Sequence, residues 1–279
     1  MTWPFWPCAR WSVTDRLHLE VFRLLRESTG QDFSGYKIST IQRRLQRRML
    51  FSRTPNLEAY VELLRADPKE LHALHKDLLI GVTYFFRDAD TFAFLKTEVF
   101  PALLAARAHE GGPRLWAAGC ATGREAYSLA ILLLEAAGGR LPAGARVFGT
   151  DIGEEYVETA RAGAYPKQIA DEVGQERLER FFTERPDGYA VGTEVHKVCS
   201  FASHDLTDEP PYADLDLISC RNVMIYFDTA QQRAVFARFH AALRPGGLLL
   251  LGRSESNLAA GRRFEPVDKS HRLYRKVEG

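Results

Sequence analysis

The stretch Arg114-Leu-Trp-Ala-Ala-Gly-Cys-Ala-Thr-Gly-Arg-Glu125 decides how the rest of the chain is interpreted. A short apolar run ends in small residues and two glycines, and a helical pattern over residues 126–137 follows at once. This order predicts a strand, a tight turn and the start of a helix. Because Gly119, Ala121 and Gly123 have little or no side chain, a ligand can lie against the backbone of this turn.

A second segment, Val147-Phe-Gly-Thr-Asp151, predicts another strand that ends in a carboxylate. In doubly wound folds, an acidic residue at this point accepts hydrogen bonds from ribose hydroxyls. The turn before it lacks the G-x-G-x-x-G order of dinucleotide sites, and Glu125 would repel a phosphate at the helix N-terminus. The expected ligand is therefore a nucleoside without phosphate and with a cationic or zwitterionic tail, and S-adenosylmethionine has this chemistry.

The composition is typical of a globular protein with one large domain or two smaller ones. Of the 279 residues, 46% are hydrophobic and 26% are charged, and the formal net charge is +1. This balance argues against bulk attraction to nucleic acid or to an anionic membrane. No apolar run approaches the ~20 residues of a membrane span. We therefore expect a cytoplasmic protein with no nucleic-acid partner and no direct membrane insertion.

The cysteines show no metal-ligand spacing, so we expect reduced thiols and no metal. They are Cys8, Cys120, Cys199 and Cys220. Residues 1–13 contain Trp3, Trp6 and Trp11 among prolines, and we treat them as a segment of uncertain order.

Residues 14–90 are expected to form a helical domain, and residues 91–279 a second domain in which the hydrophobic period changes from Arg114 onward. Helical patterns cover residues 15–28, 39–50, 56–66, 68–80 and 88–109, the last with a new segment opening at Pro101. Strand-like runs cover residues 114–119, 146–151, 196–201, 215–220 and 247–252. Strands that alternate with helices predict a mostly parallel sheet with both faces covered.

Two segments depart from this alternation. Residues 264–276 predict a closing hairpin, which is the usual ending of Rossmann-like methyltransferases. Residues 165–195 are too long for an ordinary connection, and they predict a small subdomain inserted in the sheet.

Polar residues follow the predicted strand 215–220 in the segment Cys220-Arg-Asn-Val-Met-Ile-Tyr-Phe227. Ligands of parallel sheets bind beyond the carboxyl ends of the strands, so Asn222 and Tyr226 are placed to face one. The alternative is that the apolar residues between them belong to the core and the polar pair is incidental. In Thr83-Tyr-Phe-Phe-Arg87, the guanidinium of Arg87 fits either a substrate carboxylate or a structural ion pair.

Four arginines form a cationic stripe on the predicted helix 39–50, opposite its apolar residues. They have no acidic residue at i+4, which favours an acidic macromolecular partner, while the alternative is a solvated face. These residues are Arg43, Arg44, Arg47 and Arg48.

Taken together, six segments resemble the chemotaxis receptor glutamate O-methyltransferases, the CheR family. They span most of residues 14–277 and are specific as a set. The segments are Tyr36-Lys-x-x-Thr40-x-x-Arg-Arg44, Thr83-x-Phe-Phe-Arg87, Ala121-Thr-Gly-x-Glu125-x-Tyr127-Ser128, Thr150-Asp-Ile152, Cys220-Arg-Asn-Val-Met-Ile-Tyr-Phe-Asp228 and Gly252-x-Ser-Glu-Ser256.

The resemblance implies an α/β fold: a Rossmann-like class I methyltransferase sheet, an N-terminal all-helical domain and a small inserted antiparallel subdomain. It implies an S-adenosylmethionine-dependent protein-glutamate O-methyltransferase, with S-adenosylhomocysteine as product and no metal. The acceptor would be the cytoplasmic helices of methyl-accepting chemoreceptors. Arg87 and Tyr226 would flank the reacting carboxylate. The cofactor contacts would be Gly81, Thr83, Arg87, Glu125, Asp151, Asp205, Leu206, Asn222 and Val223.

The chain departs from the family pattern at three places. Gly81 and Asp205 stand where members of the family often have asparagine. In the inserted subdomain, Arg185-Pro-Asp-Gly188 replaces a longer loop that some members use to grip a tethering peptide at the receptor C-terminus, so recognition of such a tether stays open. Two other functions also stay open: a regulatory module that binds S-adenosylmethionine, and a methyltransferase with a different acceptor.

Overall fold

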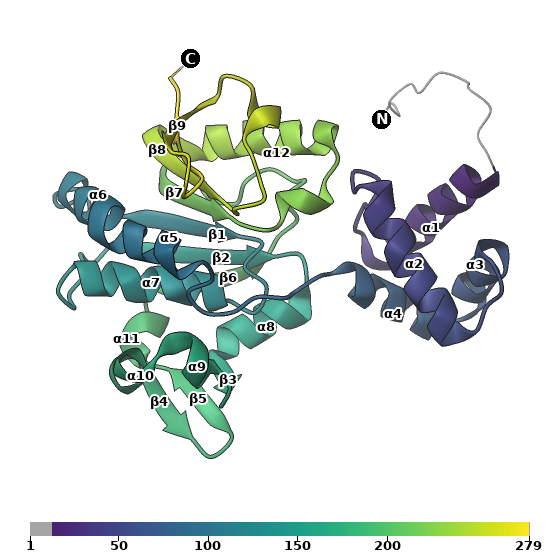
Figure 1. The fold of residues 1–279 in the computed structure, drawn as a ribbon, viewed down its shortest axis with the longest axis horizontal. Coiled ribbons are helices and arrows are strands. Elements are labelled where there is room, and N and C mark those ends of the chain that lie inside the picture. Colours follow the sequence, from purple (N-terminus) through teal and green to yellow (C-terminus); the bar gives the residue numbers. More distant parts are fainter. Residues whose placement is uncertain (1–12, 279) are drawn as a thin grey trace. The chain divides into compact units, whose positions relative to one another are not determined.

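The computed structural model describes residues 13–278, which form two compact units that divide between Ile80 and Gly81 (Figure 1). The first unit is helical and the second combines a twisted sheet with helices. The tryptophan-rich segment and Cys8 lie outside the described residues. No helix of residues 13–278 has the length and apolar character that a membrane crossing needs.

The helices of the first unit direct their apolar faces onto one core. They are α1 (Val13–Thr29), α2 (Ile38–Ser52), α3 (Leu57–Ala66) and α4 (Pro68–Leu78). Asn56 and Asp67 start α3 and α4, because their side chains accept the backbone N–H groups of Ala59 and Lys69. The core residues include Val21, Leu25, Phe33, Ile41, Leu45, Tyr60, Leu64 and Leu74.

A polar cluster joins α2, α3 and α4 beside this core. The Arg48 guanidinium contacts Glu70 through two hydrogen bonds of 3.0 and 2.6 Å, and Tyr60 Oη donates to Glu70 Oε1 at 2.7 Å. Burial, and then the neighbouring Glu70 carboxylate, raise the pKa of the Tyr60 hydroxyl. A bidentate ion pair, largely withdrawn from water, therefore joins α2 to α4, and the Tyr60 hydrogen bond adds α3.

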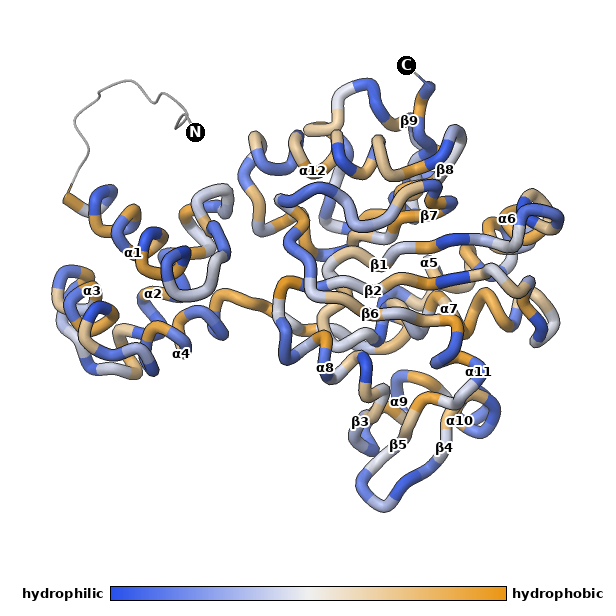
Figure 2. The backbone as a smooth tube through the Cα atoms, turned by 180° about the vertical axis from the view of Figure 1, so that it is seen from behind, coloured by the Kyte–Doolittle hydropathy of each residue, from blue (hydrophilic) through white to orange (hydrophobic). Residues whose placement is uncertain are grey.

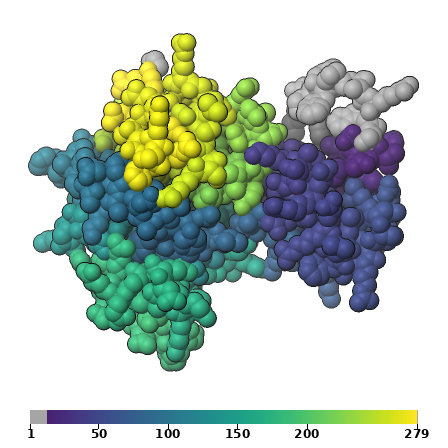
Figure 3. All heavy atoms as spheres, in the orientation of Figure 1, coloured from purple at the N-terminus to yellow at the C-terminus, as the bar shows by residue number. Residues whose placement is uncertain are grey.

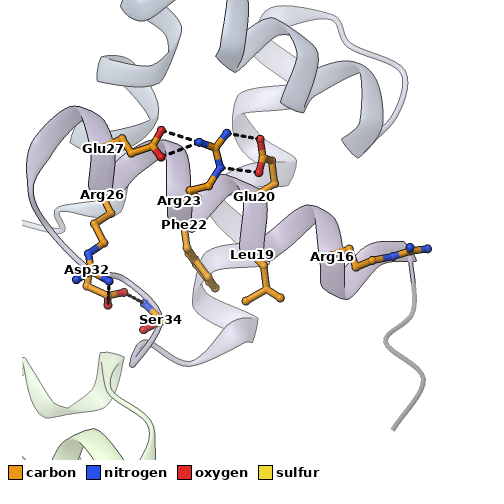
Figure 4. Close-up of a pocket in the computed structure, with 9 residues that line it drawn as sticks. All are labelled: Arg16, Leu19, Glu20, Phe22, Arg23, Arg26, Glu27, Asp32 and Ser34. Carbon is orange, nitrogen blue, oxygen red and sulfur yellow. Dashed lines mark hydrogen bonds and ion pairs between the residues drawn. The ribbon is translucent and has the colours of Figure 1, made fainter. Parts of the chain in front are cut away.

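An open cavity of about 670 Å³ lies along α1 (Figure 4). Its charged side chains pair with one another: Arg23 lies between Glu20 and Glu27, and Arg65 also reaches Glu20. Hydrogen bonds from Arg23 and Arg65 lower the pKa of Glu20 to about 2. Arg16 also lines the cavity, but the other charged residues of its lining pair with one another or with Arg65, so most of the charge here is already paired.

The second unit contains a seven-stranded sheet with the order β6-β2-β1-β7-β8-β10-β9. The first five strands in this order are parallel, and β10 runs antiparallel to β8 and β9. The closing hairpin expected over residues 264–276 is present. The strands are β1 (Arg114–Ala118), β2 (Arg146–Asp151), β6 (Cys199–Ser203), β7 (Leu215–Cys220), β8 (Leu243–Leu251), β9 (Phe264–Asp268) and β10 (Leu273–Lys276).

Helices cover both faces of this sheet, and apolar residues, orange in Figure 2, run along the central strands and α7. Leu115 and Ala117 belong to the core formed with α7 (Arg124–Ala136). Trp116 points to the other face, where its ring lies 5.5 Å from that of Phe239 in α12 (Thr229–Ala242). This alternation follows from the two-residue period of a strand. The remaining helices here are α8 (Glu154–Ala162), η2 (Met224–Tyr226) and η3 (Leu258–Ala260).

The helix expected over residues 88–109 is divided into three parts. They are α5 (Ala89–Phe94), the π-helix η1 (Leu95–Val99) and α6 (Phe100–Ala106). In the π-helix the N–H of Phe100 donates to the carbonyl of Leu95, five residues earlier. Pro101 has no N–H to donate, so the ordinary pattern changes just before it.

The expected inserted subdomain is a separate lobe of the second unit, green in Figure 3. Its three antiparallel strands have the order β3-β5-β4, and Pro186 and Asp187 form the two-residue loop between β4 and β5. A Cβ atom at Gly188 would lie 2.0 Å from the carbonyl oxygen of Tyr165, so only glycine allows β3 to pair there. The elements are β3 (Ala164–Pro166), α9 (Ile169–Val173), α10 (Gln175–Phe181), β4 (Phe182–Arg185), β5 (Gly188–Val191) and α11 (Thr193–His196).

Replacing Arg48 with Met should lower the free energy of unfolding by about 2 kcal/mol, because the Glu70 carboxylate, which is largely withdrawn from water, loses its charged partner. Urea titration followed by circular dichroism measures this change. Arg43 lies exposed on the same helix, so Arg43→Met should stay within about 0.5 kcal/mol of the parent. Equal effects of the two substitutions would contradict a structural role for Arg48.

Candidate functional site

The loops that follow β1 and β2 are joined by one carboxylate. Asp151 Oδ2 accepts the N–H of Ala121 at 2.8 Å, and Asp151 Oδ1 accepts the N–H of Gly153 at 2.9 Å. The N–H groups of Gly119 and Cys120 both donate to the carbonyl of Thr150. The turn after β1 is therefore held against the end of β2, at the carboxyl edge of the sheet where ligands of such folds bind.

Burial raises the pKa of Asp151, while hydrogen bonds from the backbone of Gly153, Ala121 and Ile152 oppose the shift. A carboxylate has about four acceptor positions, so Asp151 keeps capacity for a further donor beyond these amides. An aspartate at this position that can still accept hydrogen bonds fits the hydroxyl groups of a ribose.

The glycines of the turn serve the packing of the protein itself. Gly119 has φ of +73°, and a Cβ there would lie 2.5 Å from Cγ2 of Val223. Gly123 has φ of +82°, and a Cβ there would lie 2.6 Å from Cβ of Ala160. The sequence interpretation assigned this space to a ligand, but at these two glycines it is filled by Val223 and by α8. Ala121, between them, also has a left-handed backbone with φ of 46°.

The loop 81–88 is anchored from two sides. The N–H of Phe85 donates to Glu172 of α9 at 2.7 Å, and the N–H of Phe86 donates to Ser128 Oγ of α7 at 3.0 Å. Arg124 Nη1 bonds both Glu172 and the carbonyl of Thr83. The inserted subdomain and the helix after β1 therefore hold this loop together.

The backbone around Arg87 is strained. Phe86 and Asp88, its neighbours on either side, have φ of 51° and 64°. For residues other than glycine such conformations cost about 1–3 kcal/mol each and persist where the surroundings impose them, frequently at active sites. The half-buried Arg87 side chain donates to the carbonyl of Val82 at 3.3 Å and lies 5.5 Å from the ring centre of Tyr84.

Glu125, at the start of α7, contacts the end of β7. Ser219 Oγ donates to Glu125 Oε1 at 2.5 Å, and Arg221 Nη1 donates to Glu125 Oε2 at 3.2 Å. Arg221 Nη2 bonds Asp88 Oδ2 at 2.5 Å and the carbonyl of Arg87 at 2.6 Å. The sequence analysis gave Arg221 no role, although a charged residue directly after a fully buried strand is a usable signal.

The loop after β7 is held by a second carboxylate, that of the buried Glu255. Glu255 Oε2 accepts the N–H groups of Asn222 and Gly252 at 2.8 and 2.7 Å, and Glu255 Oε1 accepts that of Ile225 at 3.3 Å. Burial raises the pKa of Glu255 against these hydrogen bonds. Asn222 has φ of 60°, and its Oδ1 is buried without a hydrogen-bond partner among the described residues. This oxygen is therefore able to accept a hydrogen bond from a group outside the described residues.

The remaining predicted site residues lie on the same edge or near it. Asp205 follows β6, where its Oδ1 accepts the N–H of Thr207 at 2.8 Å, and Leu206 beside it is buried. A Cβ at Gly81 would lie 2.4 Å from Cζ of Tyr156. Tyr226 ends η2 and is half-buried. In residues 13–278, no three His, Cys, Asp or Glu side chains are arranged to hold a metal ion.

The four arginines of α2 lie in the first unit, and two of them have acidic partners on α4. Arg48 is bound by Glu70, and Arg47 Nε lies 3.8 Å from Asp77. No acidic residue stands at i+4 on the same helix, as the sequence shows, but in the fold the acidic partners come from another helix, α4. Arg43 is exposed, and Arg44 is half-buried.

Two domain families match the chain. The all-alpha domain of CheR methyltransferases matches residues 19–79, and the SAM binding domain of CheR methyltransferases matches residues 81–273. SAM is S-adenosylmethionine, so the site described above lies within a domain whose family binds this cofactor.

Three relatives illustrate the similarity. An uncharacterized 104.1 kDa protein of Rhodobacter capsulatus is 40% identical over 92% of this chain, which spans only 27% of that protein. The putative methyltransferase Cher3 of Pseudomonas putida is 31% identical, over 88% of this chain and 91% of its own length. The chemotaxis protein methyltransferase of Escherichia coli is 30% identical, over 92% of this chain and 94% of its own. The chain therefore belongs to the CheR methyltransferase family, whose members are S-adenosylmethionine-dependent methyltransferases.

Proposed function

We propose that this protein transfers a methyl group from S-adenosylmethionine to glutamate side chains of methyl-accepting chemoreceptors, forming glutamyl methyl esters in sensory adaptation. The family and the chemotaxis methyltransferases among its relatives support the reaction class. The structural observation that carries the proposal is the strained loop at Arg87. Arg221 links the backbone carbonyl of Arg87 to Glu125, which supports a role for Arg87 beside the proposed nucleoside site.

The residues present fit the cofactor. Asp151 would accept hydrogen bonds from the ribose hydroxyls, and the unpartnered Oδ1 of Asn222 would accept one from another polar group of the ligand. Glu125 carries the negative charge that suits a cationic or zwitterionic tail. When bound, S-adenosylmethionine supplies a methyl group on a positively charged sulfur. Thr83, Asp205, Leu206 and Val223 complete the proposed contact set.

The acceptor needs no general base, because a glutamate carboxylate, with a pKa near 4.3, is already ionised at neutral pH. Arg87 would bind one oxygen of this carboxylate and leave the other free to attack, and Tyr226 would donate a weaker hydrogen bond that aims it. Positive and negative charges both shrink as the methyl group moves, so exclusion of water favours the reaction. Alignment of the reactants is therefore the main task of the side chains.

The part of α2 that carries the exposed Arg43 and Arg47 and the half-buried Arg44 would contact the receptor. Arg43, Arg44 and Arg47 offer positive charge to an acidic helical surface, since chemoreceptor methylation sites are themselves glutamates. Arg48 is engaged by Glu70, so we leave it out of the contact surface and assign it a structural role.

Incubation with methyl-labelled S-adenosylmethionine and a chemoreceptor cytoplasmic fragment tests the proposed reaction. The label should enter the fragment and leave it as methanol at high pH, because glutamyl esters hydrolyse and N-methyl groups do not. Label that is stable to base would indicate another acceptor. Tight binding of S-adenosylhomocysteine without any transfer would indicate a regulatory module.

Replacing Arg87 with Ala should lower kcat by at least about 100-fold, because the acceptor carboxylate loses its orienting cation. Tyr226→Phe should lower kcat by about 10-fold with little effect on unfolding, since only one hydroxyl is removed. Initial rates with saturating receptor fragment measure both. If each variant keeps the parent rate, neither residue takes part in the reaction.

The affinity for S-adenosylhomocysteine should fall as the pH falls through the raised pKa of Asp151. Burial moves this pKa above the ordinary 3.8, and the protonated form loses acceptor capacity, so the dissociation constant should rise by up to about tenfold per pH unit below the pKa. Calorimetry across a pH series measures this dependence. Asp151→Asn should bind more weakly and flatten the profile, and equally tight binding by this variant would exclude the ribose contact.

Reversing the charge at Arg43, Arg44 and Arg47 to Glu should raise KM for the receptor fragment by about 10-fold or more, since three attractions become repulsions. The affinity for S-adenosylhomocysteine should not change, because none of these residues belongs to the proposed cofactor contact set. The KM of the parent should also rise with added salt. An unchanged KM in the triple variant would show that these arginines do not contact the receptor and form only a solvent-exposed face of the helix.

A further inference from the structure

Arg221 is a buried cation between the two halves of the proposed site. It follows β7 directly, its side chain is 1% exposed, and its guanidinium lies 5.1 Å from the ring centre of Phe92. It reaches Glu125 on one side and reaches Asp88 and the carbonyl of Arg87 on the other. Its Nε is buried without a hydrogen-bond partner among residues 13–278.

Stability alone gives a weak reason for this arrangement. When two charges are buried, the free energy of hydration that they lose is about as large as the free energy of their attraction. Well-packed apolar residues in their place often give a protein of equal stability. The unpartnered Nε adds to the cost of burial. What an apolar side chain cannot do is bind a carboxylate and a backbone carbonyl in a fixed planar geometry.

The geometry around Arg87 needs such a constraint. Its carbonyl lies between two residues with left-handed backbone, Phe86 and Asp88, and Arg221 Nη2 holds both this carbonyl and the Asp88 carboxylate. Nη1 of the same guanidinium donates to Glu125 Oε2, and Ser219 Oγ donates to the other oxygen of this carboxylate. One rigid group therefore sets the separation between the start of α7 and the backbone that carries Arg87.

We propose that Arg221 is a positioning residue for methyl transfer: it aligns Glu125, on the cofactor side, with Arg87, on the acceptor side. This inference rests on the proposed function. Arg221 touches neither reactant in this scheme and acts only through its partners. A longer or shorter link between them would move the acceptor oxygen away from its line of attack.

The test compares two buried arginines at opposite ends of β7. Arg221→Lys keeps the charge and loses the planar fork. Arg107→Lys is the matched control, because Arg107 is also largely withdrawn from water, at 7% exposure, and pairs with Asp214 and Asp216 at the start of β7, away from the site. The measurements are urea unfolding, calorimetry with S-adenosylhomocysteine, and initial rates with the receptor fragment.

Both substitutions should lower the urea midpoint. Only Arg221→Lys should also lower kcat, by at least about 10-fold, since a displacement of about 1 Å can cost 100-fold. It should weaken S-adenosylhomocysteine binding as well, and in a double-mutant cycle with Glu125→Gln the two effects on affinity should not add. A variant Arg221→Lys that loses stability like Arg107→Lys but keeps kcat and affinity would overturn the proposal.

Two further measurements cover the remaining outcomes. If Arg221→Lys does not fold, Asp88→Asn removes the negative charge that faces the guanidinium and should still lower kcat, and an unchanged kcat would then overturn the proposal. If the parent protein methylates no receptor fragment, the proposed function fails. The calorimetric cycle is independent of the acceptor and still decides whether Arg221 acts through Glu125, because additive effects there would reject the coupling.

Discussion

The site depends on two carboxylates, the half-buried Asp151 and the buried Glu255, that accept hydrogen bonds from the backbone of its own loops. Asp151 holds the turns after β1 and β2, and Glu255 holds the loops after β7 and β8. Burial raises the pKa of each carboxyl group, because the charged form loses hydration. The hydrogen bonds from the backbone amides act in the opposite direction and favour the charged form. An amide left without an acceptor there costs about 1–3 kcal/mol, which keeps the carboxylates in place.

Most strands could be placed from sequence, because buried parallel strands are continuous apolar runs with sharp ends. β2 and β7 have the predicted bounds, and β1 is one residue shorter. The run predicted over residues 196–201 begins in a short helix that ends at His196, and β6 starts only at Cys199. β8 begins at Leu243, earlier than predicted, since Arg244-Pro-Gly reads as a turn although the sheet continues through it.

The sequence pointed to single residues at this edge of the sheet, but not to the contacts between them. Motifs pointed to Asp151, Glu125 and Asn222, which lie at the ends of neighbouring strands or just after them. The roles of Arg221 and Glu255 were missed because their partners are more than thirty positions away or consist of backbone N–H groups, which no side-chain pattern records. The same limit applied to Arg48, whose acidic partner belongs to another helix.

The close approach of Gly119 to Val223 couples the residues that are allowed in the loop after β1 to those allowed in the loop after β7. Any side chain at position 119 would overlap the Val223 methyl group and would also have to tolerate a left-handed backbone. A larger residue is therefore admissible only where position 223 becomes smaller, and drift at either position is constrained by the other. Substitutions at positions 119 and 223 should therefore be coupled, so that the loops after β1 and β7 vary together.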